Sequence, residues 1–364
     1  MHRHRSGDAR ESDSKPTMRI SRFKAVLIRG VDIFGTRARV NGDTNAWATN
    51  LMFHEFFEAN ETKSRGRERL KRLCGWLRSE HSPISAAEYV SSVAQGSFRK
   101  NAVFVTFDDA RAKLLDGIDI FADHEIPVTV FAACGWIRGP RASGRGEILA
   151  RLMATIEHYK GDPKTVCLPD GQRLSFGSAA PDAEIDRLRA AAERDRDLEG
   201  QVWDDLDGSI KDAVIGPVTC SWSELADLAA LGVSVQSHSM SHCRLGRKTL
   251  DRIGFEVSES RRILEREFGD CPMFAYPYGT WDVYSDATTS AVQAAGYRCA
   301  FLAAAGFGLN GDPFLLPRIG IPDQGISDKL CISLVRGGQV PLILLKNRLT
   351  RRDHIRERPP SRSR

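Results

Sequence analysis

Two periods of apolar and polar residues alternate along this chain, one typical of buried strands and the other of helices. Residues 103–107 (VFVTF) and 127–133 (PVTVFAA) are continuous apolar runs of strand length. Such runs suit strands that are buried on both faces, as in a parallel sheet. The segment 111–124 between them has helical spacing, so the three segments together predict a β-α-β unit.

The same alternation continues on both sides of this unit. Upstream, residues 51–57 indicate a strand that reaches a histidine, and helices are expected at 63–80 and 83–93. Downstream, the pattern predicts helices at 222–232, 249–268 and 283–295, and strands at 233–237, 273–279, 297–303 and 314–322. Strands that alternate with helices in this way are typical of an α/β fold around a parallel sheet.

Residues 138–217 interrupt the alternation with a helix, a hairpin around Asp170-Gly171 and a charged helix over 182–199. We interpret 138–217 as an insertion at the strand-end face, where it would help to form a substrate wall or lid. The expected organisation is one catalytic domain over 25–345 that carries this insertion, between basic tails at 1–24 and 346–364.

The net charge of +5 is distributed unevenly along the chain. Residues 1–24 carry +4 and residues 346–364 carry +6, which leaves about −5 for the body. Both tails are polar and basic, so they are expected to be disordered. We therefore do not expect the body to bind nucleic acid, whereas weak attraction of the tails to an anionic membrane surface is compatible with their charge.

The cysteine pattern and the two ends of the chain indicate the cellular compartment in which the protein is expected. The eight cysteines form no CxxC pair, so we interpret them as small buried hydrophobes in a reducing compartment. The first residues lack the apolar core of a secretory signal, and the apolar run VPLILL is too short to cross a bilayer. The sequence as given predicts a cytoplasmic protein with no transmembrane segment; it predicts no oligomeric state.

Candidate chemistry lies where four predicted strands end. The polar or special groups there are His54, Asp108-Asp109, His238 and Pro277-Tyr278. In an α/β barrel the carboxyl ends of the strands converge on one mouth, where active sites form. Packing alone does not require polar groups at the ends of so many strands.

These residue types suit a bound cation. His238 and His242 are spaced i, i+4, so a helical turn would put both imidazoles on one side. Two imidazoles and one carboxylate form a typical catalytic zinc set with a position left for water. Taken alone, the histidines could equally be unrelated, and Asp108-Asp109 could be a helix N-cap with a solvated neighbour. The two observations support each other, because a cation bound by the histidines would relieve the repulsion of the two carboxylates and leave one of them free to act as a base.

Four motifs resemble those of the polysaccharide deacetylases, the NodB-homology family also known as carbohydrate esterase family 4. They are TFDD (106–109), SHSMSH (237–242), FAYPYG (274–279) and LPRIGI (316–321), within a similarity that covers roughly 49–322. The resemblance implies a distorted (β/α) barrel of seven or eight strands. It also implies a glycan substrate, removal of N-acetyl groups as acetate, and a divalent metal, most often zinc, with cobalt or nickel as alternatives.

The resemblance also implies a role for each matching residue. Asp108 matches the catalytic base, and Tyr278 matches the residue whose backbone amide binds the oxyanion. The matches to the metal ligands are Asp109, His238 and His242.

The sequence departs from the family pattern at four points. Ala110 replaces the glycine of TFDDG, and Ala275 stands where many members have an arginine that steadies the base; Arg318 is the candidate substitute for that arginine. The usual Asp-Trp motif is not evident. The late Leu-x-x-His motif that supplies the general acid is also missing, but Leu51 to His54 fits it upstream. We interpret this as a circularly permuted arrangement with His54 as general acid; alternatively, His54 only caps a strand.

Three other functions are compatible with the same residues. The first is an O-acetyl esterase, the second is a non-catalytic glycan-binding homologue, and the third is an interaction protein that uses the basic tails. Trp281 is a candidate sugar-stacking residue, although Trp136, Trp222 and Trp281 are more often simply packed.

Overall fold

The computed structural model describes residues 48–56, 62–139, 144–159, 161–168, 170–195, 198–211, 218–279, 285–303, 312–321 and 332. Both predicted tails and Trp281 lie outside these ranges. Every element described below belongs to one compact unit, residues 43–335. No described helix is both long enough and apolar enough to cross a membrane.

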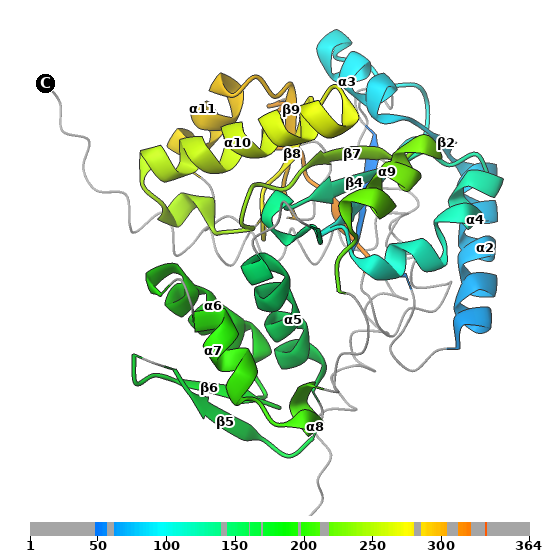
Figure 1. Cartoon of the computed structure of the whole chain (residues 1–364). Helices are drawn as coiled ribbons and strands as arrows, with labels where there is room; N and C mark the ends of the chain where they lie inside the picture. The colour runs from blue at the N-terminus through cyan, green and yellow to red at the C-terminus, as the bar shows by residue number, and fades with distance from the viewer. Residues whose placement is uncertain are drawn as a thin grey trace, which may run out of the picture. The chain divides into compact units, whose positions relative to one another are not determined.

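The centre of the fold is a parallel sheet with the strand order β10-β1-β3-β4-β7-β8-β9, and the two-residue strand β2 also pairs with β3 (Figure 1). The segment before β10 links the two edges, because Leu316 exchanges backbone hydrogen bonds with Ala300 and Leu302 while β10 pairs with β1. The predicted distorted barrel of seven or eight strands is therefore confirmed. The strands are β1 (Thr49–Phe53), β2 (Ser82–Pro83), β3 (Ala102–Asp108), β4 (Val128–Ala132), β7 (Ser234–Ser237), β8 (Met273–Ala275), β9 (Cys299–Phe301) and β10 (Ile319–Gly320).

Alternation along each strand separates the two faces of the sheet. In β3, Val103, Val105 and Phe107 join the core cluster under the outer helices, whereas Phe104 joins a second cluster inside the barrel. Tyr89 packs against Phe104 within that inner cluster, with ring centroids 4.4 Å apart and the rings tilted by 37°. The barrel interior is therefore packed with side chains, and Thr106 and Asp108 follow Phe104 on the inner face towards the carboxyl end.

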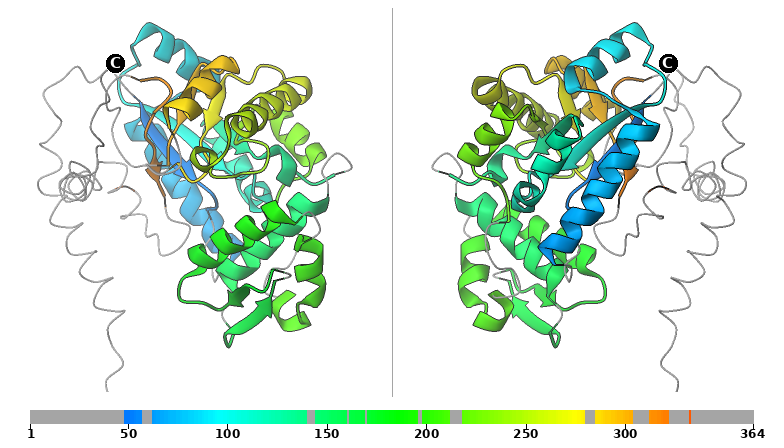
Figure 2. Two further views of the ribbon diagram at one scale, coloured as in Figure 1. Left: turned by 90° about the vertical axis from the view of Figure 1, so that its left-hand side faces the viewer. Right: turned by 90° about the vertical axis from the view of Figure 1, so that its right-hand side faces the viewer.

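Amphipathic helices cover the outer face (Figures 1 and 2). The helices on this face are α2 (Lys63–Glu80), α4 (Ile118–Asp123), α9 (Trp222–Ala230), α10 (Leu250–Phe268) and α11 (Asp286–Ala294), with short 3-10 turns η1 (Ala112–Asp116), η2 (Cys134–Trp136) and η3 (Leu245–Arg247). Helix α3 (Ala86–Gln95) instead packs against the inner cluster through Tyr89 and Val90. Helices α3 and α9 begin with serine caps: Ser85 and Ser221 each form a capping box with a glutamate three residues later.

Some predicted boundaries were wrong. The helix expected at 111–124 is split into η1 and α4 at Gly117, where a Cβ would come within 2.9 Å of the Phe56 and Leu70 side chains. Close packing therefore requires glycine at a point where helical spacing continues. The strand expected at 314–322 is regular only over Ile319–Gly320, because its first part crosses over to pair with β9.

The segment between β4 and β7 has a hydrophobic cluster of its own. In Figures 1 and 2 its elements gather on one side of the parallel sheet. The predicted hairpin is present as an antiparallel pair. The elements are α5 (Gly144–His158), β5 (Lys164–Cys167), β6 (Arg173–Phe176), α6 (Pro181–Arg194), α7 (Leu198–Asp205) and α8 (Gly208–Lys211).

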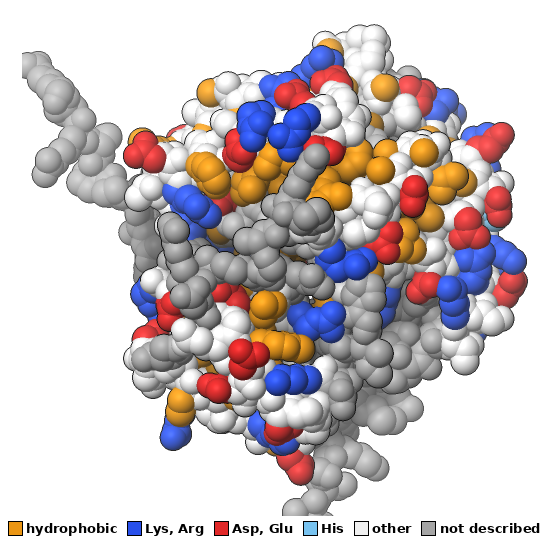
Figure 3. Space-filling view, viewed as in Figure 1, with side chains coloured by type: hydrophobic (Ala, Val, Ile, Leu, Met, Phe, Trp, Pro, Cys, Tyr) orange, Lys and Arg blue, Asp and Glu red, His pale blue; other side chains and the backbone are white. Residues whose placement is uncertain are grey.

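Two surface features follow from these elements. Six of the seven described cysteines are buried, as expected, whereas Cys167 on β5 is exposed. On the face shown in Figure 3, the described basic and acidic side chains are interspersed and form no extended patch of one sign.

Candidate metal centre and active site

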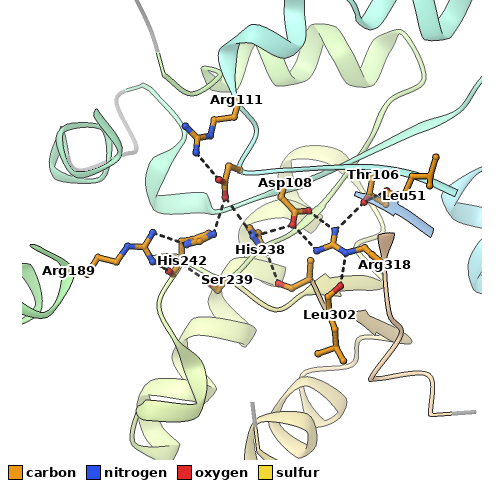
Figure 4. Close-up of polar contacts among 12 residues, drawn as sticks. Leu51, Thr106, Asp108, Arg111, Arg189, His238, Ser239, His242, Leu302 and Arg318 are labelled. Atoms are coloured by element: carbon orange, nitrogen blue, oxygen red, sulfur yellow. Dashed lines mark hydrogen bonds and ion pairs between the residues drawn. The ribbon is translucent and has the colours of Figure 1, made fainter. Parts of the chain in front are cut away.

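The carboxyl ends of neighbouring strands bring the predicted site residues together (Figure 4). Asp108 ends β3, and His238 follows β7. The ligand atoms of Asp109, His238 and His242 all lie within 4.8 Å of one another, and all three residues are buried. The geometry therefore allows one cation to contact all three side chains.

The distances around Asp109 fit a cation. Its Oδ1 lies 3.0 Å from Nε2 of His242 and 3.7 Å from Nε2 of His238. Among the described residues, no group donates this oxygen a hydrogen bond of acceptable geometry. A buried carboxylate oxygen in that position is costly, and a cation between the three ligands would satisfy it.

The protonation states also fit. Burial lowers the pKa of both His238 and His242, that of His242 to about 3, so both rings are neutral. Burial opposes ionisation of Asp109, but His242 and Arg111 outweigh it and hold the pKa of this carboxyl well below its usual value. Neutral imidazoles and an ionised carboxylate are the forms that coordinate a metal.

The second contacts of the two histidines differ. Nδ1 of His238 lies 2.7 Å from the carbonyl of Ala275, so this nitrogen carries the proton and Nε2 presents its lone pair to the site. Nδ1 of His242 lies 3.0 Å from a guanidinium nitrogen of Arg189, which can only donate. Coordination through Nε2 of His242 therefore competes with the Arg189 contact for the tautomer of this ring.

Asp108 has a separate cationic partner. Arg318 donates to both of its oxygens at 2.7 Å, and also to Thr106 and to the carbonyl of Leu302. Arg318 is completely buried. Burial raises the pKa of the Asp108 carboxyl, but the charge and hydrogen bonds of Arg318, together with the neighbouring His238, leave it below its usual value. Asp108 is thus an ionised carboxylate in a fixed orientation beside the three candidate ligands.

Comparisons with known proteins found a matching family model and similar folds. The family model for polysaccharide deacetylases matches residues 188–300, less than half of the chain. The Streptococcus pyogenes deacetylase PplD, solved in complex with acetate, is similar with a TM-score of 0.50 and 14% identity over 80% of this chain and 99% of its own. IcaB from Ammonifex degensii is similar with a TM-score of 0.49 and 14% sequence identity, over 81% of this chain and 98% of its own. No curated protein matches.

The resemblance to the polysaccharide deacetylases is confirmed. The matched segment contains the SHSMSH and FAYPYG motifs, and the structural likeness, at this identity, supports the fold alone. The TFDD motif lies outside the matched segment, but the barrel places it beside the other two.

The departures from the polysaccharide deacetylase pattern now have structural explanations. Asp109 and Ala110 both adopt left-handed backbone conformations, with φ of 68° and 49°. Ala110 therefore keeps a conformation that glycine adopts more readily, and hydrogen bonds such as Cys220 N to Ala110 O hold it there. Arg318 pairs with Asp108, a contact that the small side chain of Ala275 cannot make.

The route by which the two histidines meet differs from the predicted one. Residues 238–242 form a loop and not a helical turn, with Ser239 at φ 67° and His242 at φ 54°. The two imidazole centroids nevertheless lie 4.7 Å apart. The spacing was informative, but the helical explanation for it was wrong.

The structure places His54 beside this centre. Phe53 pairs with Phe107, so His54 follows β1 next to the end of β3 that carries Asp108. Its imidazole is partly buried, and none of the side-chain hydrogen bonds among the described residues involves it. β1 itself lies between β3 and β10.

The sequence analysis missed Arg189. This residue of α6 donates to the carbonyl of His242 at 2.8 Å and lies between two aromatic rings, 5.3 Å from the centroid of Trp136 and 4.5 Å from that of Tyr278. Trp136 in turn stacks on His242 at 4.5 Å. No motif marks an arginine in a charged helix, so only the fold reveals that the segment 138–217 reaches the centre.

The Asp108–Arg318 pair yields a prediction for stability. Arg318→Met should lower the free energy of unfolding by about 3–5 kcal/mol, because it leaves a buried carboxylate without its partner. Urea unfolding measures this. Asp108→Asn in the same chain should recover part of the loss, and Arg194→Met, which breaks the exposed Arg194–Asp170 pair, should cost under about 1 kcal/mol. An unchanged unfolding energy for Arg318→Met would contradict the burial of this pair.

The lowered histidine pKa values predict how the metal-free chain responds to acid. The unfolded chain binds protons at His238 and His242 below pH of about 6.5, whereas the folded chain does not, so stability should fall as pH decreases from there. The slope is at most about 1.4 kcal/mol per pH unit for each histidine. Urea unfolding with chelator at several pH values measures it, and His242→Gln should flatten the curve. Equal stability at pH 7.5 and pH 5 would contradict neutral burial.

Proposed function

We propose that this chain is a metal-dependent deacetylase that removes N-acetyl groups from acetamido sugars of a glycan and releases acetate. The observation that carries the proposal is the meeting of Asp109, His238 and His242 within 4.8 Å, with the ionised Asp108 next to them. A glycan-binding homologue would have no need of a second carboxylate held apart from the cation ligands.

The donor set favours zinc. Two imidazole nitrogens and one carboxylate oxygen suit Zn²⁺ and also accept Co²⁺ or Ni²⁺. When bound, the cation would polarise the acetyl carbonyl and acidify a water molecule. His238 is already held in the coordinating tautomer by the carbonyl of Ala275.

The remaining steps are assigned to residues of the chain. Asp108, fixed by Arg318, takes a proton from the attacking water. The backbone amide of Tyr278 donates to the developing oxyanion; Tyr278 has φ 63°, and its ring lies 5.1 Å from that of His242. His54, beside the end of β3, donates a proton to the departing amine. The products are acetate and an amino sugar.

One observation favours O-acetyl esters as a second candidate substrate. Among the described residues, no side-chain hydrogen bond to His54 is found that would orient it as an acid. An alcohol is a better leaving group than an amine and needs less acid assistance. Weak support of His54 would therefore impair hydrolysis of esters less than that of amides.

Acetate release from N-acetylated oligosaccharides tests the proposal. The full chain with Zn²⁺ should release acetate, and treatment with a chelator should abolish release until the metal is restored. Asp108→Asn should lower kcat by at least about 100-fold, because the base is lost, while the variant still binds one equivalent of metal.

The control for this experiment is Asp170→Asn, which alters an exposed carboxylate on the β5–β6 turn and should leave acetate release unchanged. Release that persists at full rate in chelator, or in Asp108→Asn, would exclude the proposed chemistry.

The role of His54 gives a separate prediction. His54→Ala should slow N-deacetylation by about 100-fold and O-deacetylation by less, because only the amine requires a proton before it departs. Rates measured on matched N-acetyl and O-acetyl substrates test this. A variant that matches the wild-type chain on both would remove His54 from the mechanism.

A further inference from the structure

A buried glutamate that belongs to none of the sequence motifs accepts hydrogen bonds from the loop between the two histidines. Glu256 lies on α10 and is fully buried. Its Oε2 accepts the backbone N–H groups of Met240 at 3.0 Å and Ser241 at 2.8 Å, and its Oε1 accepts the Ser241 hydroxyl at 2.6 Å. Arg252, one turn earlier on the helix, balances the charge at 2.6 Å. Glu256 itself is not among the candidate metal ligands.

The loop that Glu256 holds is strained. Ser239 and His242 have φ of 67° and 54°, in the left-handed region that costs a residue with a side chain about 1–2 kcal/mol. Such conformations persist only where surrounding contacts determine them. The strain therefore lies in the segment that sets the positions of both imidazoles.

The opposite side of the loop is fixed by η2. The N–H groups of Cys134 and Gly135 donate to the carbonyls of Ser239 and Met240 at 3.2 and 2.8 Å. A Cβ on Gly135 would lie 2.9 Å from the Met240 carbonyl oxygen, so this close approach requires glycine. Glu256 supplies the matching restraint from the other direction, because it binds the N–H groups of the same peptides.

We infer that Glu256 is a positioning residue for the metal centre: by binding two consecutive backbone N–H groups, it holds the loop in the conformation in which His238 and His242 share one cation. The alternative is an ordinary satisfied acid of the core, which contributes to stability and nothing more. The two readings differ in what happens to the cation site of a variant that still folds. The inference rests on the proposed function only for the identity of the site as a metal centre.

The substitutions follow from the contacts. Glu256→Ala removes every acceptor from the loop. Glu256→Gln keeps one oxygen that can accept both N–H groups and an amide that can donate to Ser241, so it should restore the geometry. Glu256→Asp withdraws the carboxylate by one methylene and serves if the alanine variant does not fold. The matched control is Glu259→Ala on the same helix, where an exposed pair with Arg262 is lost.

Two measurements on the full chain decide between the readings. The first is Co²⁺ titration, with the affinity and the visible absorption spectrum of the bound ion. Glu256→Ala should bind Co²⁺ about 10–100-fold more weakly with altered absorption bands, Glu256→Asp should change in the same direction, and Glu256→Gln and Glu259→Ala should stay within a few-fold of the wild-type chain. The second is amide hydrogen exchange of the metal-free chain, in which residues 239–242 should exchange at least 10-fold faster in Glu256→Ala than in the control.

The outcomes separate this inference from the proposed function. Wild-type cobalt affinity and spectrum in a folded Glu256→Ala or Glu256→Asp variant, or unchanged exchange at 239–242, would overturn the positioning role. A loss in Glu256→Gln as large as that in Glu256→Ala would also contradict it. If the wild-type chain bound no Co²⁺ at all, the proposed function would fail, and the exchange measurement would still decide whether Glu256 holds the loop.

Discussion

Asp108 and Asp109 are adjacent carboxylates at the buried end of β3, and both are ionised. Two such charges repel each other and lose hydration, so the surrounding structure must compensate each of them. It does so on separate sides. Arg318, the residue directly before β10, holds Asp108, whereas the two histidines and Arg111 face Asp109. This division requires β10 to lie near β3 across β1, and thus depends on the curled sheet.

The rest of the fold contributes by restricting the loops at the barrel mouth. α3 fills the opposite end of the interior, where Tyr89 packs on Phe104, so the polar groups have space only at the carboxyl ends of the strands. Three further segments hold the loop that joins His238 to His242. They are α10 through Glu256, η2 through Gly135, and α6 through Arg189. Rigidity at the centre therefore comes from elements far apart in the sequence.

The sequence predicted the part of the site that strand periodicity exposes. Asp108, Asp109 and His238 end apolar runs, and a parallel sheet brings such ends together whatever the loops do. It could not predict the left-handed turns at Asp109 and Ser239, because neither residue type marks them as glycine would. Arg189 and Glu256 were missed for another reason: each lies in a charged helix where solvated arginine and glutamate are common, and only tertiary packing distinguishes them. At Gly117 tertiary packing acts in the opposite way. It interrupts the helix predicted at 111–124, although the local sequence pattern continues through this position.

Arg318 also constrains the chemistry that Asp108 can perform. By lowering the pKa of this carboxyl, it keeps Asp108 ionised but would make it a weak base in the proposed reaction. A weak base takes a proton poorly from bulk water, whose pKa is about 15.7, and far more readily from water that a zinc ion has acidified to about 7. In the proposed reaction, the bidentate pair at 2.7 Å and the cluster of Asp109, His238 and His242 would therefore depend on each other. The firm hold on Asp108 suits catalysis only if the neighbouring ligands carry a cation, which is why the two features are best explained as one centre.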